Sequence, residues 1–269
     1  MIYDCFSYWD EDLLLDLRLK ILNNYVDYFV IVEGNKTWQN NQKKLRFEID
    51  KFKKFKDKII YIPVTDLPDG IDPYQRENHQ RNSIINGLKN SNDNDLILIS
   101  DLDEIPNPKK LISFDVKKRF AVFKQKHFYY KFNLQSAKYP YWYGSRICVK
   151  KYLKSPQWLR NLKFKKRPFW RIDKFRLNNI IEDGGWHFCN LKTPENLLYK
   201  YENLCETNDP INFQEKIDIK HLDIKEIQKK IEKKIDIIGR DDEFVKIDVN
   251  NNFPKELVLN IRKYQDWIE

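Results

Sequence analysis

The feature that most constrains the fold is an apolar run that ends abruptly in three carboxylates, in the segment DLILISDLDEIP at residues 95–106. Such a run is typical of a buried strand in a parallel or mixed sheet. Asp101, Asp103 and Glu104 then lie just past its carboxyl end, where open α/β sheets bind ligands. The sequence therefore predicts a ligand site at this strand end.

The spacing of Asp101 and Asp103 suits a hard cation. On extended backbone, residues two apart face the same side, and Pro106 helps to end the strand. Mg²⁺ and Mn²⁺ are commonly held by one or two carboxylates together with substrate phosphates. An acidic turn or a helix cap is an equally good interpretation of the spacing taken alone.

Length and charge bound the classes of protein that fit this sequence. At 269 residues the chain is long enough for one large α/β domain with its own core, so we expect residues 1–269 to form a single unit. The formal net charge of +9 attracts polyanions, anionic membrane surfaces or phosphorylated substrates. Charge alone does not choose among them, and a peripheral contact with a membrane is compatible with it.

The cysteines show no metal-binding or disulfide pattern. The four are Cys5, Cys148, Cys189 and Cys205. They are scattered without a CxxC pair, so the sequence indicates neither a zinc site nor a dense disulfide scaffold, and we expect reduced thiols.

The start of the chain reads as a strand rather than as a targeting segment. It has no basic region followed by an apolar leader. No apolar run approaches the roughly 18 residues that a membrane-spanning helix needs. We therefore expect a cytoplasmic protein without a signal peptide or a membrane anchor.

Strands and helices alternate through the first 106 residues. Apolar runs predict strands at 2–8, 28–33, 58–64 and 95–100. Helices are predicted after a cap at Asp10, over 43–55, and after Asp72 and Pro73 through Arg81 to Leu88. This alternation indicates an α/β fold with right-handed βαβ units and a mostly parallel central sheet flanked by helices.

The pattern changes after Pro106. Two segments, 120–133 and 143–153, alternate apolar and polar residues and predict longer, partly antiparallel strands. The later segments 194–205 and 224–238 are predicted to be helical, so we expect a helical C-terminal segment.

A basic stretch at 163–171 interleaves aromatic residues with lysine and arginine. Stacking rings and cations are what single-stranded nucleic acids need, so a nucleic-acid platform is one interpretation. A strand with one solvated basic face is the commoner structure for such a pattern and is preferred here.

A second polar locus contains Glu182, Asp183, two glycines, Trp186 and His187. Adjacent glycines permit a tight turn and a close approach of the backbone to a ligand. The ring of Trp186 would stack on a sugar, although a hairpin turn with a packed tryptophan and a hydrogen-bonded core histidine explains the same residues. Arg81, on the helix that leads toward the acidic strand, would face a diphosphate or nucleotide, or else remain solvated.

Several of these segments together resemble glycosyltransferase family 17. SDLDEIP at 100–106 and GWHF at 185–188 are specific when they occur together, although either alone would be weak. The other matching segments are YDCF at 3–6, LLLDLRL at 13–19, VDYFVIVE at 26–33, Glu77 with Arg81, IGRD at 238–241, and the stretch from Phe253 to Asn260. The resemblance therefore spans nearly the whole chain.

The resemblance implies a GT-A type nucleotide-sugar-binding fold and an inverting transfer from a UDP-sugar, with UDP-GlcNAc as the expected donor, to a glycan acceptor. Asp101 and Asp103 match the DxD motif of such enzymes, whose carboxylates hold Mn²⁺ or Mg²⁺ against the diphosphate. Glu33 and Arg81 match positions that face the nucleotide. Residues 1–106 would form the nucleotide-binding half, and residues 107–269 the acceptor-side half with the C-terminal helices. No nucleic-acid partner is expected.

The inversion that the resemblance implies needs a general base, which takes the acceptor hydroxyl proton on the face opposite the diphosphate. Asp183 is the first candidate and Glu182 the second, because a flexible turn can place either beside the acceptor. His187 would supply a third metal ligand through a neutral imidazole nitrogen, and Trp186 would contact the sugar. Glu104 is expected to hold the metal loop by accepting backbone N–H groups.

Two other classes of protein compete with this interpretation. A basic nucleic-acid-binding protein would bind with strong salt dependence and without a divalent cation. A metal-dependent phosphohydrolase would use Asp101 and Asp103 but would release inorganic phosphate without an acceptor.

Overall fold

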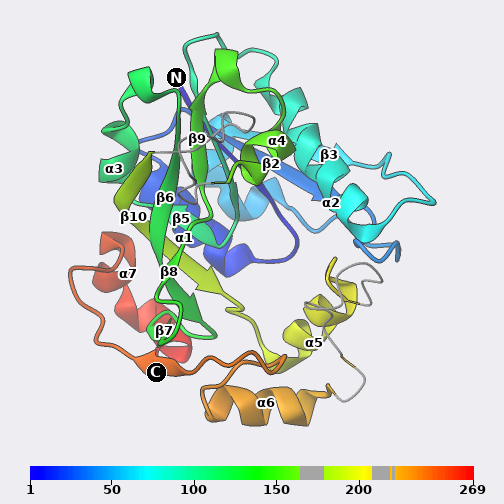
Figure 1. Cartoon of the computed structure of the whole chain (residues 1–269), viewed down its shortest axis with the longest axis vertical. Coiled ribbons are helices and arrows are strands. Elements are labelled where there is room, and N and C mark those ends of the chain that lie inside the picture. The colour runs from blue at the N-terminus through cyan, green and yellow to red at the C-terminus, as the bar shows by residue number, and fades with distance from the viewer. Residues whose placement is uncertain (164–178, 208–218, 220–221) are drawn as a thin grey trace, which may run out of the picture.

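A computed structural model describes the chain except for residues 164–178, 208–218 and 220–221. A large sheet runs through the centre, with helices on both of its faces (Figure 1). Its first half is parallel and has the order β3–β2–β1–β4. These strands are β1 (Ile2–Ser7), β2 (Tyr28–Gly34), β3 (Ile59–Val64) and β4 (Leu96–Asp101). The four strands predicted from the apolar runs are thereby confirmed.

Beyond β4 the sheet is mixed, so the prediction of a mostly parallel sheet is wrong. β9 (Arg146–Val149) pairs antiparallel with both β4 and β6 (Phe120–Tyr129). β10 (Ile180–Cys189) runs parallel to β6 and antiparallel to β5 (Glu104–Pro106). The remaining strands of the described chain are β7 (Leu134–Ser136), β8 (Tyr141–Trp142) and β11 (Phe244–Lys246).

The length of the connections explains this change. Parallel neighbours need a crossover of a dozen or more residues, whereas antiparallel neighbours can be joined by a short turn. The links that join β6, β7, β8 and β9 are all short, and β7, β8 and β9 each return antiparallel to β6. The antiparallel pairing predicted after Pro106 is confirmed, and 120–133 contains the long strand β6. The segment 143–153 is not a long strand, because β9 covers only Arg146–Val149 and a 3₁₀ turn follows it.

Helices cover the two faces of the sheet with separate hydrophobic cores. One face packs against α1 (Asp12–Leu22), η1 (Ile49–Lys58), α7 (Lys255–Leu259) and η5 (Ile261–Trp267). The other packs against η2 (Ser83–Leu88), which continues α2 (Pro73–Asn82), and against α4 (Pro156–Asn161). A third core joins α5 (Pro194–Asn203) and α6 (Ile224–Glu232) to the far end of β6. The short elements are α3 (Pro108–Ile112), η3 (Val116–Lys118) and η4 (Lys150–Tyr152).

The helix predicted after Asp72 is confirmed, together with its cap. The Asp72 carboxylate accepts the backbone N–H of Gln75 at 2.8 Å, and the Gln75 side chain accepts the backbone N–H of Asp72 at 3.2 Å. This reciprocal pair is a capping box, and proline at the first helical position is already preset for a helix. After Asn82 the chain continues in 3₁₀ turns to Leu88.

Two other helix predictions are corrected by the structure. α1 begins at Asp12 with Glu11 as its N-cap, because the carboxylate of Asp10 pairs instead with Lys192. The segment 43–48 is not helical, because the buried carboxylate of Glu33 accepts its backbone N–H groups. Only the later part of the predicted 43–55 helix is helical, as the 3₁₀ element η1.

The predicted glycine-rich turn is a bulge inside β10. The register with β6 shifts between Ile181 and Gly185, and Asp183 has a φ of 51°. Gly185 has a φ of 130°, and a Cβ there would lie 2.2 Å from the carbonyl oxygen of Ile105. Glycine therefore allows β5 to approach β10 closely at this point.

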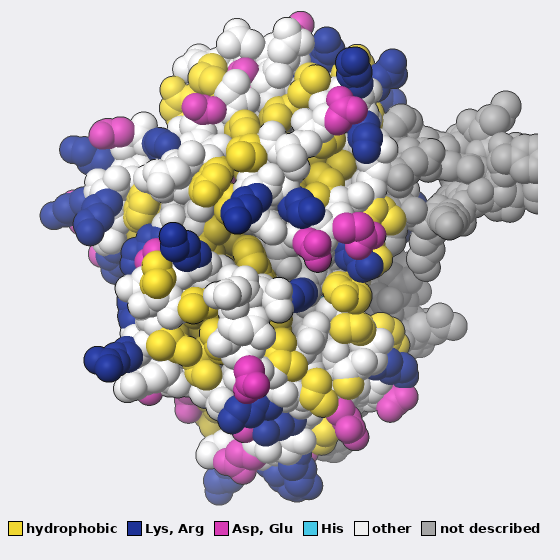
Figure 2. All heavy atoms as spheres, turned by 90° about the vertical axis from the view of Figure 1, so that its left-hand side faces the viewer, with side chains coloured by type: hydrophobic (Ala, Val, Ile, Leu, Met, Phe, Trp, Pro, Cys, Tyr) yellow, Lys and Arg dark blue, Asp and Glu magenta, His cyan; other side chains and the backbone are white. Residues whose placement is uncertain are grey.

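The helices predicted near the carboxyl end exist but are shorter than expected, as α5 and α6. Among the described residues, no helix has the length and apolarity that crossing a membrane requires. The basic stretch at 163–171 lies outside the described residues except for Lys163. On the face that forms the left-hand side of Figure 1, basic side chains are interspersed with acidic and apolar ones (Figure 2).

Candidate active site

The carboxyl ends of β1 and β4 open into a cavity of about 290 Å³. Part of its lining is the loop of residues 101–104, where β4 turns into β5. Other walls come from Trp9 after β1, Arg81 of α2, His187 of β10 and Lys200 of α5. The cavity lies at the edge of the sheet where the apolar run predicted a ligand site.

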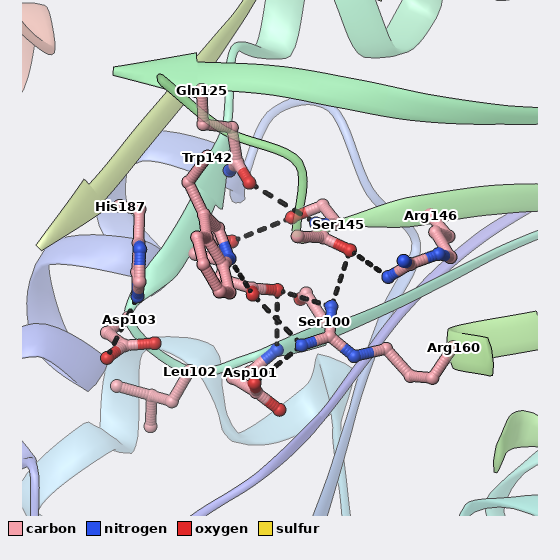
Figure 3. A network of polar contacts seen from close by, with 12 residues as sticks. Ser100, Asp101, Leu102, Asp103, Gln125, Trp142, Ser145, Arg146, Arg160 and His187 are labelled. Atoms are coloured by element: carbon pink, nitrogen blue, oxygen red, sulfur yellow. Dashed lines mark hydrogen bonds and ion pairs between the residues drawn. The ribbon is translucent and has the colours of Figure 1, made fainter. Parts of the chain in front are cut away.

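Asp101, which lines this cavity, lies between two arginines. Arg81 donates to its Oδ1 at 3.1 Å. Arg160 of α4 donates to its Oδ2 at 2.6 Å, as Figure 3 shows. Desolvation would raise the pKa of Asp101, but the positive charges of Arg160 and Arg81 outweigh it and hold that pKa well below the usual range. Asp101 is therefore a carboxylate, and both of its oxygens are engaged by guanidinium groups.

Asp103 faces an imidazole instead. Its Oδ2 lies 3.4 Å from Nε2 of His187, as Figure 3 shows. Burial would lower the pKa of His187, but the negative charge of Asp103 outweighs it and raises that pKa well above its ordinary value. Desolvation of Asp103 is in turn outweighed by His187, so the pKa of Asp103 is lowered.

Glu104 accepts a backbone N–H of the loop of residues 101–104, as the sequence predicted. Its Oε2 accepts the backbone N–H of Asp101 at 3.0 Å, and its carboxylate also accepts from Arg160 at 2.8 and 3.0 Å. The indole of Trp142 donates to Oε1 at 2.7 Å (Figure 3). A Cβ at Gly144 would lie 2.0 Å from this carboxylate, so glycine is needed for the close approach.

Arg18 of α1 fixes the same loop and was missed by the sequence analysis. Its guanidinium donates to the backbone carbonyls of residues 101, 102 and 104 at 2.9–3.1 Å. It also donates to Ser100 Oγ and to both carboxylate oxygens of Asp4, and both Arg18 and Asp4 are fully buried. A basic residue within the apolar stripe of a predicted helix was the signal that could have found it.

The structure brings four predicted site residues to the cavity, namely Arg81, Asp101, Asp103 and His187. It places the other four elsewhere. They are Glu33, Glu182, Asp183 and Trp186, none of which lines the cavity.

Each of these four has a different environment. Glu33 is buried and accepts from Lys43, Tyr61 and two backbone N–H groups. Trp186 lies in the core and donates to the carbonyl oxygen of Asn252. Glu182 pairs with Lys124, and Asp183 is exposed on the bulge. Their functional roles stay predictions, and the cavity supplies other candidates.

Glu206 is a cavity carboxylate that the sequence analysis also missed. Burial raises its pKa, and the negative charge of Glu77 raises it further. Within the described residues we find no ion pair or side-chain hydrogen bond to Glu206, whereas Glu11, Glu77, Asp101 and Glu104 all have one. It lies just beyond the segment 194–205 that was predicted to be helical, at a position for which the sequence analysis gave no signal.

The fold and the cavity define an α/β protein with a polar ligand site at the carboxyl edge of its sheet. A model of glycosyltransferase family 17 matches residues 1–240, and the chain therefore belongs to this family. The family resemblance noted from the sequence is thereby confirmed.

The chain is also similar to curated proteins named beta-1,4-mannosyl-glycoprotein 4-beta-N-acetylglucosaminyltransferase. The human protein is 24% identical over 215 residues, which is 70% of this chain and 40% of the relative. The rat protein is 24% identical and the mouse protein 23% identical over 215 residues, in each case 39% of the relative. The chain thus matches about two fifths of the length of these relatives.

Proposed function

We propose that this protein is a metal-dependent inverting glycosyltransferase of GT-A type that moves GlcNAc from UDP-GlcNAc to a glycan acceptor. The relatives' names support the sugar and suggest β-mannosyl glycans as first acceptors to test. The observation that carries the proposal is the convergence of Asp101, Asp103 and Arg81 on one cavity at the carboxyl ends of parallel strands, where Arg81 and Arg160 both donate to Asp101.

The two arginines suit a diphosphate. A guanidinium group matches phosphate oxygens with paired donors. Arg81 and Arg160 each already donate one hydrogen bond to the Asp101 carboxylate. Arg81 is anchored by Glu77 at 2.5 Å, and Arg160 by Glu104. These carboxylates fix the positions of both guanidinium groups, and other N–H groups of the same arginines donate to Asp101 at the cavity.

A divalent cation would be held by Asp103 and Asp101. The donor set fits Mn²⁺ or Mg²⁺, because these ions accept one or two carboxylates and take their remaining ligands from phosphate and water. When bound, the cation would neutralise charge on the departing diphosphate. Arg18 and Glu104 keep the backbone of this loop in place, so its carboxylates stay oriented toward the cavity.

We propose Glu206 as the general base. A base for an acceptor hydroxyl must be free of strong cationic partners and have a pKa closer to neutrality than an exposed carboxylate. Glu206 lines the cavity and, among the described residues, forms no ion pair. The positive charges of Lys200 and Arg240 lower its pKa, but burial outweighs them and keeps that pKa raised. Asp183 and Glu182 remain the alternatives predicted from the sequence.

The decisive experiment incubates the purified protein with UDP-GlcNAc and Mn²⁺, with and without β-mannosyl glycans, and measures product by mass spectrometry. Asp103→Asn should abolish transfer, whereas Asp50→Asn, an exposed control on η1, should not. The panel should include UDP-glucose, UDP-galactose and GDP-mannose. Release of inorganic phosphate without an acceptor would instead favour a phosphohydrolase, and transfer unaffected by EDTA would exclude the metal-dependent mechanism.

A further inference from the structure

Three potential metal ligands meet at one wall of the cavity. They are His127 of β6 with His187 and Cys189 of β10, and their ligand atoms all lie within 4.8 Å of one another. The fold explains the meeting. His187 and Cys189 are two residues apart on one strand, and the parallel register places His127 directly beside His187. The two rings stack with centroids 4.8 Å apart.

Each imidazole has one nitrogen engaged and one without a partner. Nδ1 of His127 lies 3.1 Å from the carbonyl oxygen of Tyr139, and Nε2 of His187 lies 3.4 Å from the Asp103 carboxylate. The opposite nitrogens, Nε2 of His127 and Nδ1 of His187, are buried without a hydrogen-bond partner. The two residues are only 4% and 6% exposed.

This arrangement is that of metal-binding histidines. A histidine that binds a metal usually donates its other N–H to a carbonyl or a carboxylate, which fixes the tautomer and aims the free nitrogen at the ion. Both types of partner are present here, one for each ring. Buried polar atoms without partners are rare and costly in folded proteins, so two of them in a cluster that also contains a thiol indicate a missing ligand.

We propose that His127, His187 and Cys189 bind a zinc-class cation, with a fourth coordination position open to the cavity. Imidazole and thiolate donors select Zn²⁺ over Mg²⁺ or Mn²⁺, which prefer oxygen. The site is therefore separate from the hard cation of the proposed transfer reaction, and Asp103 contributes to it by holding the ring of His187. The sequence analysis expected His187 to bind the hard cation with Asp101 and Asp103, and this proposal assigns it to the second site instead. His127 and Cys189 gave no sequence signal, because the three ligands come from two paired strands rather than from a CxxC.

Binding requires a small movement of the rings. Zinc-to-ligand bonds of about 2.0–2.3 Å place neighbouring donor atoms roughly 3.3–3.8 Å apart. The two rings are now parallel to within 5°, so at least one must rotate for both nitrogens to point at one ion. Trp142 contacts both rings and would move with them.

The test uses Co²⁺ as a spectroscopic substitute for Zn²⁺ in metal-stripped, full-length protein without any nucleotide sugar. We expect one equivalent of Co²⁺ to give a near-ultraviolet thiolate charge-transfer band, and one equivalent of Zn²⁺ to remove it. Cys189→Ser should lose the band. Cys205→Ser should keep it, because Cys205 also lines the cavity but lies against Glu77 and Pro73. Asp103→Asn should weaken Co²⁺ binding roughly 10-fold or more.

A measurement on the unaltered protein tests the proposal even if the variants fail to fold. Zn²⁺ should slow alkylation of Cys189, measured by mass spectrometry, while leaving the alkylation of Cys205 unchanged. Absence of stoichiometric Co²⁺ or Zn²⁺ binding, a band that persists in Cys189→Ser, or equal protection of both thiols would overturn the proposal. None of these readouts depends on sugar transfer, so failure of the proposed enzymatic function would leave this result intact.

Discussion

Replacing Arg18 by methionine should destabilise the protein strongly, because it leaves the Asp4 carboxylate buried and unpaired. Both side chains are fully buried, and the guanidinium contacts Asp4 at 2.5 and 2.8 Å. Removing one partner of a buried ion pair typically costs about 3–5 kcal/mol. Each kcal/mol lowers the melting temperature of a chain of this size by roughly 2–4 °C. Arg18→Met should therefore melt roughly 6–20 °C below the unaltered protein.

The design includes a matched control and a partial rescue. Lys20→Met changes a partly exposed lysine on the same helix, whose pair with Asp16 is worth about 0–1 kcal/mol. The double variant Asp4→Leu with Arg18→Met should regain part of the lost stability, because it removes the unpaired carboxylate. It should not regain UDP affinity, since the loop carbonyls that Arg18 holds stay free. Melting curves by circular dichroism measure all three, and a loss below about 1 kcal/mol in Arg18→Met would refute the reasoning.

Three further predictions concern the cavity. Asp103→Ala should abolish transfer while keeping the fold, as checked by circular dichroism and turnover under saturating Mn²⁺; near-native turnover would contradict the assignment. Glu206→Gln should lower acceptor-dependent turnover by roughly 10²-fold or more. Glu206 can accept a proton only above its raised pKa. As the pH falls, the activity of the unaltered enzyme should therefore be lost at a higher pH than if the base were an exposed glutamate. Asp183→Asn should remain active. An inactive Asp183→Asn with an active Glu206→Gln would instead support Asp183 as the general base, as the sequence predicted. UDP with Mn²⁺ at a hundred times Kd should add about 2.7 kcal/mol of stability, a rise of roughly 5–11 °C in Tm. The rise should vanish with EDTA and shrink in Asp103→Ala, and a melting curve that UDP and Mn²⁺ do not move would count against the nucleotide site.

The parallel half of the fold could be predicted because its determinants are local. The apolar run before Asp101 specifies a buried strand, and Asp72 with Pro73 specifies a helix start within four residues. By contrast, the segment 43–48 has a helical pattern but is held extended by Glu33, which precedes it by ten residues or more. A local pattern carries no information about such a distant acceptor.

The candidate site divides in the same way. Asp101, Asp103 and Glu104 are contiguous, so their shared position at a strand end follows from the sequence. Glu206 lines the cavity only because the segment after α5 folds back onto it, and Arg160 reaches Asp101 only because α4 packs nearby. The sequence predicted a turn at Asp183 where the structure has a bulge, because two glycines fit either one and only the pairing of β10 with β6 decides between them.

The central position of β1 has a consequence for synthesis of the chain. Tyr3 pairs with Tyr28, but the other edge of β1 pairs with β4, beginning with Ile2 opposite Leu96. At ribosomal rates of about 5–20 residues per second, β4 is synthesised roughly 5–20 s after β1, and the edge of β1 that pairs with β4 stays unpaired for that time. An apolar strand with an open edge is a template for association with other chains. Residues 2–7 are therefore the part of the chain that is exposed longest to association with other chains during translation.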